Sequence, residues 1–457
     1  MLTYQLKKAP GVPLYEALYR CIRADILSGK LTPNQKLPSK RALCANLKVS
    51  KITVETAYNQ LLSEGYIRSE EKVGYFVEAV TEIAPRIPPK ATISPQPDAD
   101  LIDLTANGSI HFPFSVWSKL QREVVLDLGE KLLSPTPNQG LFALRQAISL
   151  HLSQFRGMQV DPDNILIGAG TDFLYNLLVQ LLGRDKIYAV EEPGYGKIRK
   201  IYHAAGAKCI SAPMDSMGVL PNLDAQVLHI SPSHHFPTGL ITPFSRRQAL
   251  LAWAKEEENR YIIEDDYDSE FRFFAHPLPS MQSMDGGERV IYMNTFSKTL
   301  SPSIRISYMV LPSALMVAFQ QKLGFYSCTV PSFEQYSLAK FIEQGYFEKH
   351  LNRMRKFYKL RRNRVLSALE NCPLGENLTV LEADAGLHFL VKVNTDMSDE
   401  ALTQHLKAAG FKVQTLSQFY HGQVPPYARH QLVINYSALT DEALTQLEQK
   451  LSQMYEK

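Results

Sequence analysis

Long apolar runs and paired cysteines are both missing from this sequence. None of its apolar stretches approaches the roughly 18 to 20 residues that span a bilayer, and the N-terminus, MLTYQLKKAPGVPLYEALYR, lacks the apolar core of a signal peptide. The five cysteines are scattered, odd in number and never spaced as Cys-x-x-Cys. These absences predict a reduced, cytoplasmic protein with no membrane segment, no structural zinc site and no other metal-ligand constellation.

A large excess of one charge is also missing, but the charge is unevenly distributed. The net charge is +3 for 457 residues, yet residues 1–78 hold 12 Lys and Arg against 7 Asp and Glu, a local +5. The other 37 basic and 39 acidic residues leave −2 for the rest of the chain. A basic N-terminal piece is expected where a protein meets phosphates, although a merely soluble basic module has the same composition.

Proline marks a boundary between these two parts. Five prolines fall between Pro85 and Pro97, in a segment without helical or strand periodicity. Because proline removes backbone donors and favours extended conformations, residues 79–100 are predicted to form a semi-rigid linker. We therefore expect an N-terminal domain at 1–78 and a larger domain at 101–457, in a chain too long for one ordinary domain.

Three helices and a hairpin are predicted in the N-terminal piece. Apolar residues recur at helical spacing from Leu14, and Ser39 and Ser50 stand where N-caps would begin a second and a third helix. The stretch YIRSEEKVGYFV indicates two short strands around a turn. A helix, a helix-turn-helix and a wing in this order are typical of a DNA-binding module.

Four cations occupy positions from which such a module reaches DNA. Lys40 and Arg41 begin the second helix, Lys51 begins the third, and Lys72 lies in the wing. These places contact phosphates and the major groove. For any one of these cations taken singly, a solvated surface residue is the safer interpretation.

Residues 11–78 resemble the winged helix-turn-helix domain of GntR-type bacterial regulators. The matching pieces are PLYEALYRCIRADILSGKL, LPSKRALCANL, VSKITVETAYNQLLSEGYI and GYFV. Two departures, Asn34-Gln35 in place of a glycine turn and Lys72-Val73 at the wing tip, leave the operator sequence open. The resemblance implies double-stranded promoter DNA as a partner, with contacts at Ser39, Arg41, Ser50, Lys51, Thr53 and Gly74.

Strand-like and helix-like segments alternate after residue 100. The runs NILIGAG, KIYAVEE, AQVLHIS, RYIIEDD and RVIYMNT are short and apolar, and helical patterns separate them. This order predicts an α/β domain with a mostly parallel sheet that is covered on both faces. Such sheets bind ligands at their strand ends, so the polar residues that follow these runs are candidates for a site.

Lys298, in NTFSKTLSPSIRIS, is framed by hydroxyls and a more distant arginine. A partly desolvated lysine can form an imine with an aldehyde cofactor. Pyridoxal 5′-phosphate also needs hydroxyls, helix-start N–H groups and a cation for its phosphate, and a carboxylate for its ring nitrogen. The strand ends carry such groups in order: Gly170, Thr171, Asp172, Tyr195, Asp265, Asp266, Tyr267, Thr295, Ser297 and Arg305.

The whole chain resembles the MocR subfamily of GntR regulators. EDDYDSEFR, SHHFPTG and NTFSKTL are close to signatures of that subfamily, and residues 103–455 look like a fold-type I, aspartate aminotransferase-like domain. Such a domain is expected to have a mostly parallel sheet, a smaller C-terminal α+β subdomain and a homodimeric assembly. The resemblance therefore implies pyridoxal 5′-phosphate as the cofactor.

The same resemblance implies roles for individual residues. Lys298 would form the internal aldimine, Asp265 would pair with the pyridinium, and His234 would lie near the cofactor. Asp266 is the alternative ring partner, and His235 stays undecided. A structural ion pair is the alternative for Arg305. The other implied contacts are Tyr267 at the 3-hydroxyl, Tyr195 over the ring, and Thr171, Ser297 and Arg305 at the phosphate.

Residues that hold an aminotransferase substrate are partly missing. Val433, in LVINYSAL, stands where active aminotransferases carry an arginine for the substrate carboxylate, and valine cannot form a bidentate contact. Arg429 lies four residues upstream as a possible substitute. Ser134 replaces a tyrosine that a neighbouring subunit often contributes, and Asp172 stands where Gln or Ser is common.

These patterns together predict a pyridoxal-phosphate-dependent, DNA-binding transcriptional regulator. Its large domain would sense pyridoxal phosphate itself or an amino compound through Lys298. One alternative is an active aminotransferase that carries a DNA-binding module. Another is a regulator whose large domain has lost the cofactor.

Overall fold

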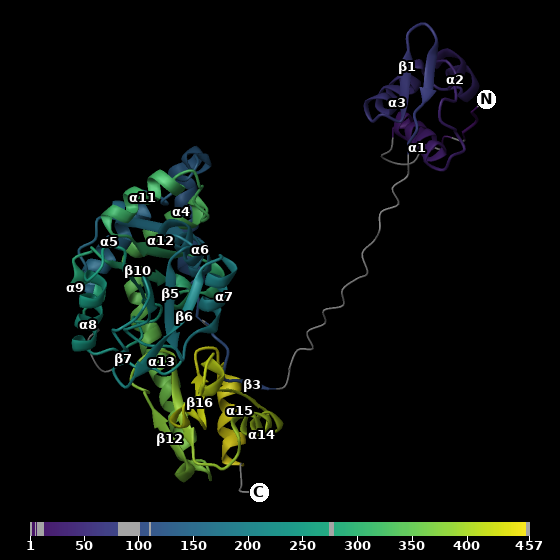
Figure 1. Ribbon diagram of the computed structural model, residues 1–457. Helices are drawn as coiled ribbons and strands as arrows, with labels where there is room; N and C mark the ends of the chain where they lie inside the picture. Colours follow the sequence, from purple (N-terminus) through teal and green to yellow (C-terminus); the bar gives the residue numbers. More distant parts are fainter. Residues whose placement is uncertain are drawn as a thin grey trace. The chain divides into compact units, whose positions relative to one another are not determined.

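The computed structural model describes residues 2–4, 6, 13–80, 101–108, 111–273 and 278–453. The chain divides into two compact units, Met1–Gln96 and Pro97–Lys457 (Figure 1). Residues 81–100, which make up most of the predicted linker, lie outside the described residues. Within the described part of the chain, no helix has both the length and the apolar character needed to cross a bilayer.

The N-terminal unit consists of three helices and a two-stranded antiparallel wing. Ser39 Oγ accepts a hydrogen bond from Ala42 N (3.2 Å), and Ser50 Oγ accepts one from Thr53 N (3.2 Å). Each serine thereby satisfies a backbone N–H that the helix itself leaves unpaired. The elements are α1 (Leu14–Leu27), α2 (Lys40–Leu47), α3 (Lys51–Ser63), β1 (Ile67–Glu70) and β2 (Gly74–Val77).

The turn before α2 uses asparagine where a glycine is usual. Asn34 has a φ of 64°, in the left-handed region that asparagine tolerates better than most residues. Its N–H donates to Val77 O (2.9 Å), and its Oδ1 accepts from Arg68 Nη2 (2.9 Å). The departure at Asn34-Gln35 therefore keeps this turn joined to the wing.

The second unit is built on an eight-stranded sheet of order β4-β11-β10-β9-β8-β5-β6-β7. Strands β10, β9, β8, β5 and β6 run parallel, whereas β11 is antiparallel to both β10 and β4. The mostly parallel sheet predicted from the sequence is confirmed. The strands are β4 (Ile165–Gly168), β5 (Ile187–Glu192), β6 (Lys208–Asp215), β7 (Gly218–Val219), β8 (Val227–Ile230), β9 (Tyr261–Asp265), β10 (Val290–Thr295) and β11 (Ser307–Val310).

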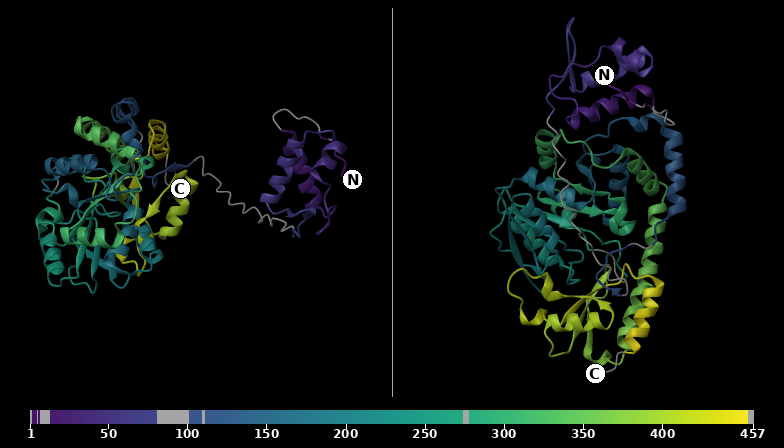
Figure 2. Two further views of the ribbon diagram at one scale, coloured as in Figure 1. Left: turned by 90° about the horizontal axis from the view of Figure 1, so that it is seen from above. Right: turned by 90° about the vertical axis from the view of Figure 1, so that its right-hand side faces the viewer.

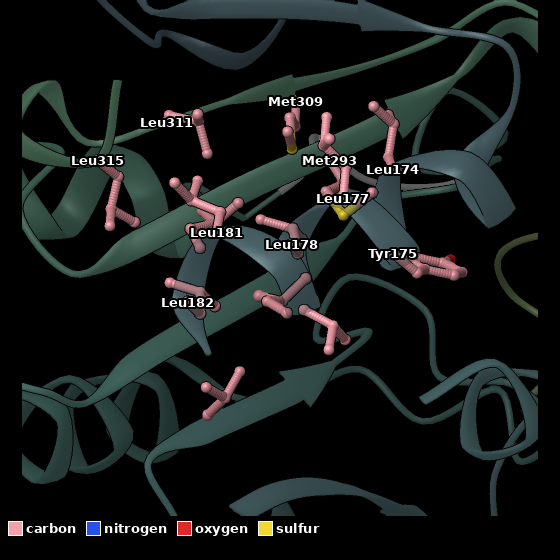
Figure 3. Packing of buried hydrophobic residues seen from close by; sticks show 14 of the residues in the cluster. Leu174, Tyr175, Leu177, Leu178, Leu181, Leu182, Met293, Met309, Leu311 and Leu315 are labelled. Carbon is pink, nitrogen blue, oxygen red and sulfur yellow. The ribbon is translucent and has the colours of Figure 1, made fainter. Parts of the chain in front are cut away.

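Helices cover both faces of this sheet (Figures 1 and 2). Successive strand residues point to opposite faces, so Ile263 of β9 packs in the cluster around α6, and Ile262 packs in the cluster around α8. Figure 3 shows the first cluster, in which leucines of α6 lie against Met293 and Met309. The helices are α4 (Phe114–Leu128), α5 (Phe142–Arg156), α6 (Thr171–Leu182), α7 (Gly196–Ala204), α8 (Phe244–Lys255), α9 (Met281–Asp285), α10 (Phe296–Thr299), α11 (Ser313–Leu323) and α12 (Ser332–Glu343).

A smaller α+β subdomain completes the second unit. Its antiparallel sheet has the order β12-β13-β16-β15, and β3 pairs in parallel with β14. Because β3 begins just after residue 100, the first described residues beyond the predicted linker join this subdomain. Its elements are β3 (Ile102–Asp103), α13 (Tyr346–Glu370), β12 (Leu378–Leu381), β13 (His388–Val393), α14 (Asp399–Ala408), β14 (Phe411–Lys412), β15 (Gln414–Thr415), β16 (Gln431–Asn435) and α15 (Asp441–Ser452).

Leu178 of α6 provides a test of this packing. Its side chain is 0% exposed, so Leu178→Ala should lower the free energy of unfolding by about 2 to 5 kcal/mol through lost burial and the cavity left behind. Tryptophan fluorescence during urea unfolding reports on the second unit alone, since Trp117 and Trp253 both lie in it. The matched control is Leu360→Ala, at a position that is 68% exposed. Equal losses in the two variants would contradict the placement of α6.

Candidate functional site

A cavity of about 210 Å³ lies where strand ends of the large sheet meet the C-terminal subdomain. Its walls come from the start of α6, from residues at and after the ends of β5, β9 and β10, and from β13 and β16. Parallel strands bring their carboxyl ends to one edge of a sheet, where open α/β sheets bind ligands. Nine residues predicted from the sequence line this cavity: Thr171, Asp172, Tyr195, Asp265, Tyr267, Thr295, Ser297, Lys298 and Arg305.

Lys298 presents its amine to the cavity from α10. Thr295 ends β10 and caps α10, with its Oγ1 accepting a hydrogen bond from Ser297 N (3.1 Å). Lys298 Nζ donates to Asn107 Oδ1 (2.6 Å). Lys298 is partly buried in the cavity, and desolvation lowers its pKa to about 8, against a smaller opposing effect of the Asp268 carboxylate. More of the amine is therefore neutral and nucleophilic near pH 7 than in an exposed lysine.

Asp265 and Asp266 are neighbours in sequence with different surroundings. Asp265 ends β9 and lines the cavity, and its Oδ2 accepts hydrogen bonds from Tyr175 Oη (2.5 Å) and from His229 Nε2 (3.4 Å). Its Oδ1 has no hydrogen-bond partner among the described residues. Asp266 lies outside the cavity lining and forms a buried ion pair with Arg156 (3.2 Å). Of the two candidates, Asp265 is the carboxylate positioned to meet a ligand.

Tyr175 and His229 belong to a buried chain of hydrogen bonds that sequence reasoning missed. Tyr202 Oη and His229 Nδ1 lie 2.6 Å apart, and the other ring nitrogen of His229 faces Asp265. The available signal was the single histidine in the apolar strand VLHI. A histidine held between two partners orients the carboxylate it contacts.

The start of α6 and Arg305 form the cationic end of the cavity. The first N–H groups of a helix have no intrahelical acceptor, and Thr171 begins α6 beside Gly170. Asp172, which stands where Gln or Ser is common, forms ion pairs with Lys197 (2.6 Å) and with Arg305 (3.7 Å). The Arg305 side chain is 54% exposed and lines the cavity, so this ion pair leaves it accessible to a ligand.

Two predicted residues, Gly170 and His234, stand behind the cavity lining. Gly170 has a φ of 91°, and a side chain there would collide with the Arg305 guanidinium. His234 is buried, and its Nδ1 lies 2.9 Å from Asp268 Oδ2. Gly170 thus leaves room for the Arg305 side chain, and His234 holds the carboxylate of the cavity residue Asp268 through a hydrogen bond.

One trio in the described residues brings potential metal ligands together, although the sequence predicts no metal site. Ligand atoms of His234, Asp268 and His388 all lie within 4.8 Å of one another. Two ligands of a tetrahedral zinc stand about 3.3 Å apart, whereas His234 Nδ1 and Asp268 Oδ2 are 2.9 Å apart. That contact has hydrogen-bond geometry, so the trio is interpreted as a hydrogen-bonded cluster.

The substrate-carboxylate position carries no cation. Val433 of β16 is buried in an apolar cluster with Leu390 and Leu416. Arg429 is exposed and lies outside the cavity lining, so it does not take the place of the missing arginine. Arg199 of α7 does line the cavity, and its Nη2 donates to Ser211 Oγ (2.6 Å). No motif in the sequence singles out Arg199.

The predicted DNA-contact residues cluster at the starts of α2 and α3 and in the wing. Arg41 and Lys51 are exposed and form no ion pair with any described residue. Lys40, by contrast, pairs with Glu55 (3.1 Å) and lies over the Tyr75 ring. Gly74 has a φ of 140°, and a side chain there would lie 3.1 Å from Lys36 Cε. The remaining positions are the helix caps Ser39 and Ser50, and Thr53 beside the second cap.

Comparisons with known proteins match both units. Residues 14–77 match the family "Bacterial regulatory proteins, gntR family", and residues 99–451 match "Aminotransferase class I and II". The chain is 37% identical to the uncharacterized HTH-type transcriptional regulator YdeL of Bacillus subtilis, over 93% of each chain. It is 33% identical to the probable rhizopine catabolism regulatory protein MocR of Rhizobium meliloti, over 92% of this chain and 90% of that one.

Solved structures resemble the second unit. A multiple substrate aminotransferase from Thermococcus profundus matches with a TM-score of 0.68 and 23% identity, over 78% of this chain and 91% of that one. A Pyrococcus horikoshii kynurenine aminotransferase matches with a TM-score of 0.67 and 24% identity, over 78% and 90%. At these identities the likeness shows the fold alone, which is the fold-type I fold expected from the sequence.

The two matched families define a class of DNA-binding transcriptional regulators that carry an aminotransferase-like domain. Within this class, the chain belongs to the MocR subfamily of GntR regulators. The aminotransferase class I and II domain implies pyridoxal 5′-phosphate as the cofactor. The residues of the cavity fit this cofactor: they offer an amine, a buried carboxylate with one unpartnered oxygen, and a helix start beside an arginine.

The lowered pKa of Lys298 predicts its reactivity as a function of pH. Only the neutral amine is acetylated, so labelling of Lys298 by acetic anhydride should reach half its maximum near pH 8. Exposed lysines should do so near about pH 10.4. Mass spectrometry of the cofactor-free protein gives both profiles in one experiment, with the exposed lysines as internal controls. A common midpoint for all lysines would contradict the burial of this amine.

Proposed function

We propose that this regulator binds pyridoxal 5′-phosphate at Lys298 and senses the cofactor itself or an amino compound that reacts with it. The binding of this effector would alter the binding of the DNA-binding domain to promoter DNA. The observation that carries the proposal is a nucleophilic lysine in a cavity that has cofactor-binding groups but lacks a carboxylate-binding arginine at Val433. The domain boundaries at 78 and 101 and a cytoplasmic location belong to the same proposal.

The residues that line the cavity support a specific set of cofactor contacts. Pyridoxal phosphate supplies an aldehyde that condenses with amines, and a ring that withdraws electrons from them. Lys298 would hold the aldehyde carbon, and Asp265 would face the ring nitrogen, with Tyr175 and His229 fixing its carboxylate. The other proposed contacts are Tyr195 against the ring, Tyr267 at the 3-hydroxyl, and Thr171, Ser297 and Arg305 at the phosphate.

The absence of a carboxylate clamp favours sensing over transamination. A buried valine at the strand position of the usual arginine cannot orient an α-carboxylate during catalysis. Active transamination remains the second candidate, because the fold is that of aminotransferases. The names of relatives support two kinds of effector: one is named for rhizopine catabolism, and another, PdxR of Corynebacterium glutamicum, for pyridoxine biosynthesis.

A short segment joins the cavity to the chain that leads toward the DNA-binding unit. Ile102 and Asp103 form β3, which pairs with β14, and Asp103 also forms an ion pair with Lys412 (2.8 Å). Asn107, only a few residues later, accepts the hydrogen bond of Lys298. The lysine amine is thus connected to residues next to the predicted linker by one hydrogen bond and the few residues between Asn107 and Asp103. This connection supports allosteric coupling between the cavity and the DNA-binding domain. Such coupling requires that the ligand make different contacts in two conformations of the protein.

A homodimer is also part of the proposal. Large apolar side chains are exposed on the second unit: Phe114 is 76%, Leu133 is 78% and Phe325 is 77% exposed. Such groups on a soluble protein often mark an interface. A two-fold dimer would present two winged helices to two half-sites of promoter DNA.

The cofactor proposal predicts a visible absorbance band. Purified protein given pyridoxal phosphate should develop the absorbance band of the lysine-bound cofactor, and Lys298→Ala should lose this band. Among the described residues, the other lysine that lines the cavity is Lys197, and its amine is paired with Asp172. Asp265→Asn should keep the band but weaken cofactor affinity by about tenfold or more, because a charged hydrogen bond is lost. The absorbance titration measures both.

The matched control for this experiment is Lys208→Ala, at the exposed first residue of β6, which should bind like wild type. A wild-type protein without the band would refute the cofactor site. Steady, multiple-turnover conversion of an amino acid to a keto acid would support the aminotransferase alternative instead of the sensor.

The DNA-binding proposal predicts a loss of phosphate contacts. Arg41→Ala and Lys51→Ala should each weaken binding to promoter DNA, and each should reduce the slope of log K against log salt by about 0.9 per lost contact. Fluorescence anisotropy between about 50 and 200 mM salt measures both quantities. Lys30→Ala is the control, because Lys30 follows α1 and pairs with Asp25 (3.1 Å). Unchanged slopes in both variants would argue against these contacts.

A further inference from the structure

We propose that Asn107 recognises the effector, donating a hydrogen bond from its side-chain Nδ2 to an oxygen atom that lies close to the effector's amine. This inference rests on the proposed function, because it assigns the ligand class of the same cavity. Asn107 lies in the segment between the predicted linker and α4, and it lines the cavity beside Lys298. It was not among the residues that the sequence singled out.

A chain of hydrogen bonds determines which way the Asn107 amide points. The oxygen and nitrogen of an asparagine side chain are interchangeable unless a partner distinguishes them. Here the distinguishing partner is the backbone N–H of Ser437, which can only donate and which lies 2.9 Å from Asn435 Oδ1. Asn435 must therefore point its Nδ2 the other way, where it donates to Asn107 Oδ1 (2.6 Å).

The same oxygen of Asn107 also accepts from Lys298 Nζ, at 2.6 Å. With two donors on Oδ1, the amide cannot turn over without placing two N–H donors against each other. Its Nδ2 is thus directed away from Asn435 and Lys298, and it has no hydrogen-bond partner among the described residues. A ligand in the cavity would meet this group as an available donor.

The surroundings of Asn107 set the chemical class of the ligand. No arginine stands at Val433, and burial keeps the pKa of the cavity residue His388 well below its ordinary value, so this side chain is neutral. The neutral amide N–H of Asn107 can donate a hydrogen bond to a hydroxyl, a carbonyl or a carboxylate oxygen, and the acceptor does not need a negative charge. Because the Asn107 amide also contacts Lys298, the oxygen should lie within a few bonds of the effector's amine. The predicted class is therefore amines with a nearby oxygen, including amino alcohols as well as amino acids.

A matched pair of amines tests this assignment. Ethanolamine and propylamine have the same length, and only ethanolamine carries an oxygen. Each is titrated into the full-length protein loaded with pyridoxal phosphate, and the change in the visible absorbance gives the Kd. Wild type should prefer ethanolamine by about fivefold, the value of one neutral hydrogen bond. Asn107→Leu should bind both amines equally, and it should still form the visible band with pyridoxal phosphate.

Two further variants separate the amide from its segment. Thr105→Val removes a hydroxyl that bonds to Asp103 Oδ1 (2.6 Å) on the same segment, and it should keep the ethanolamine preference. Asn435→Asp removes the donor that orients Asn107, and it should reduce the preference.

The outcomes distinguish this inference from the proposed function. If wild type forms no visible band with pyridoxal phosphate, the proposed function fails. If the band forms but Asn107→Leu prefers ethanolamine as strongly as wild type, the assignment of Asn107 is wrong and the cofactor site stands. Loss of pyridoxal phosphate binding in Asn107→Leu would also overturn it, because Asn107 would then serve the cofactor.

Discussion

The parallel alignment of β5, β8, β9 and β10 is the constraint on which the cavity depends. It gathers the carboxyl ends of these strands at one edge of the sheet, and the chain leaves each strand there through a polar residue. Asp265 and Thr295 occupy such positions, and α10 then carries Lys298 back toward Asp265 across the same edge. The apolar packing of α6 against the sheet holds a helix start, with its free N–H groups, at this edge too (Figure 3).

The C-terminal subdomain adds Leu387, His388 and Asn435 to the wall of the cavity at this edge, and these residues help to set which ligand the site binds. Alternate residues of β16 face the cavity side, where Asn435 takes part in the lining and Val433 enters an apolar cluster. Strand β16 thus places the amide of Asn435 in the cavity lining and has a valine, not an arginine, at position 433. These two residues favour binding of an amine over catalytic transamination, in which the α-carboxylate of an amino acid must be held in place. Relatives of this chain are likewise named as regulators.

The pair Asp265 and Asp266 illustrates why neighbouring residues with the same chemistry need tertiary structure to be told apart. The chain leaves β9 at this point, and one carboxylate meets Tyr175 and the cavity while the other meets Arg156 from α5. Arg156 is over a hundred residues away in sequence, so no local pattern reveals the pairing. Asp172 is similar, because its ion pair with Lys197 joins the starts of two helices that the sequence treats separately.

The winged helix, the mostly parallel sheet, the family and nine of the residues that line the cavity could be predicted from the sequence, because periodicity, helix caps and strand-end motifs each occupy a short stretch of chain. Tertiary structure alone decided the roles of residues whose partners are distant. It placed Asn107 and Asn435 against Lys298, Tyr175 and His229 behind Asp265, and Gly170 and His234 outside the lining. Hydrogen bonds and burial between separate elements depend on how those elements pack, and packing is not encoded at a fixed spacing along the chain.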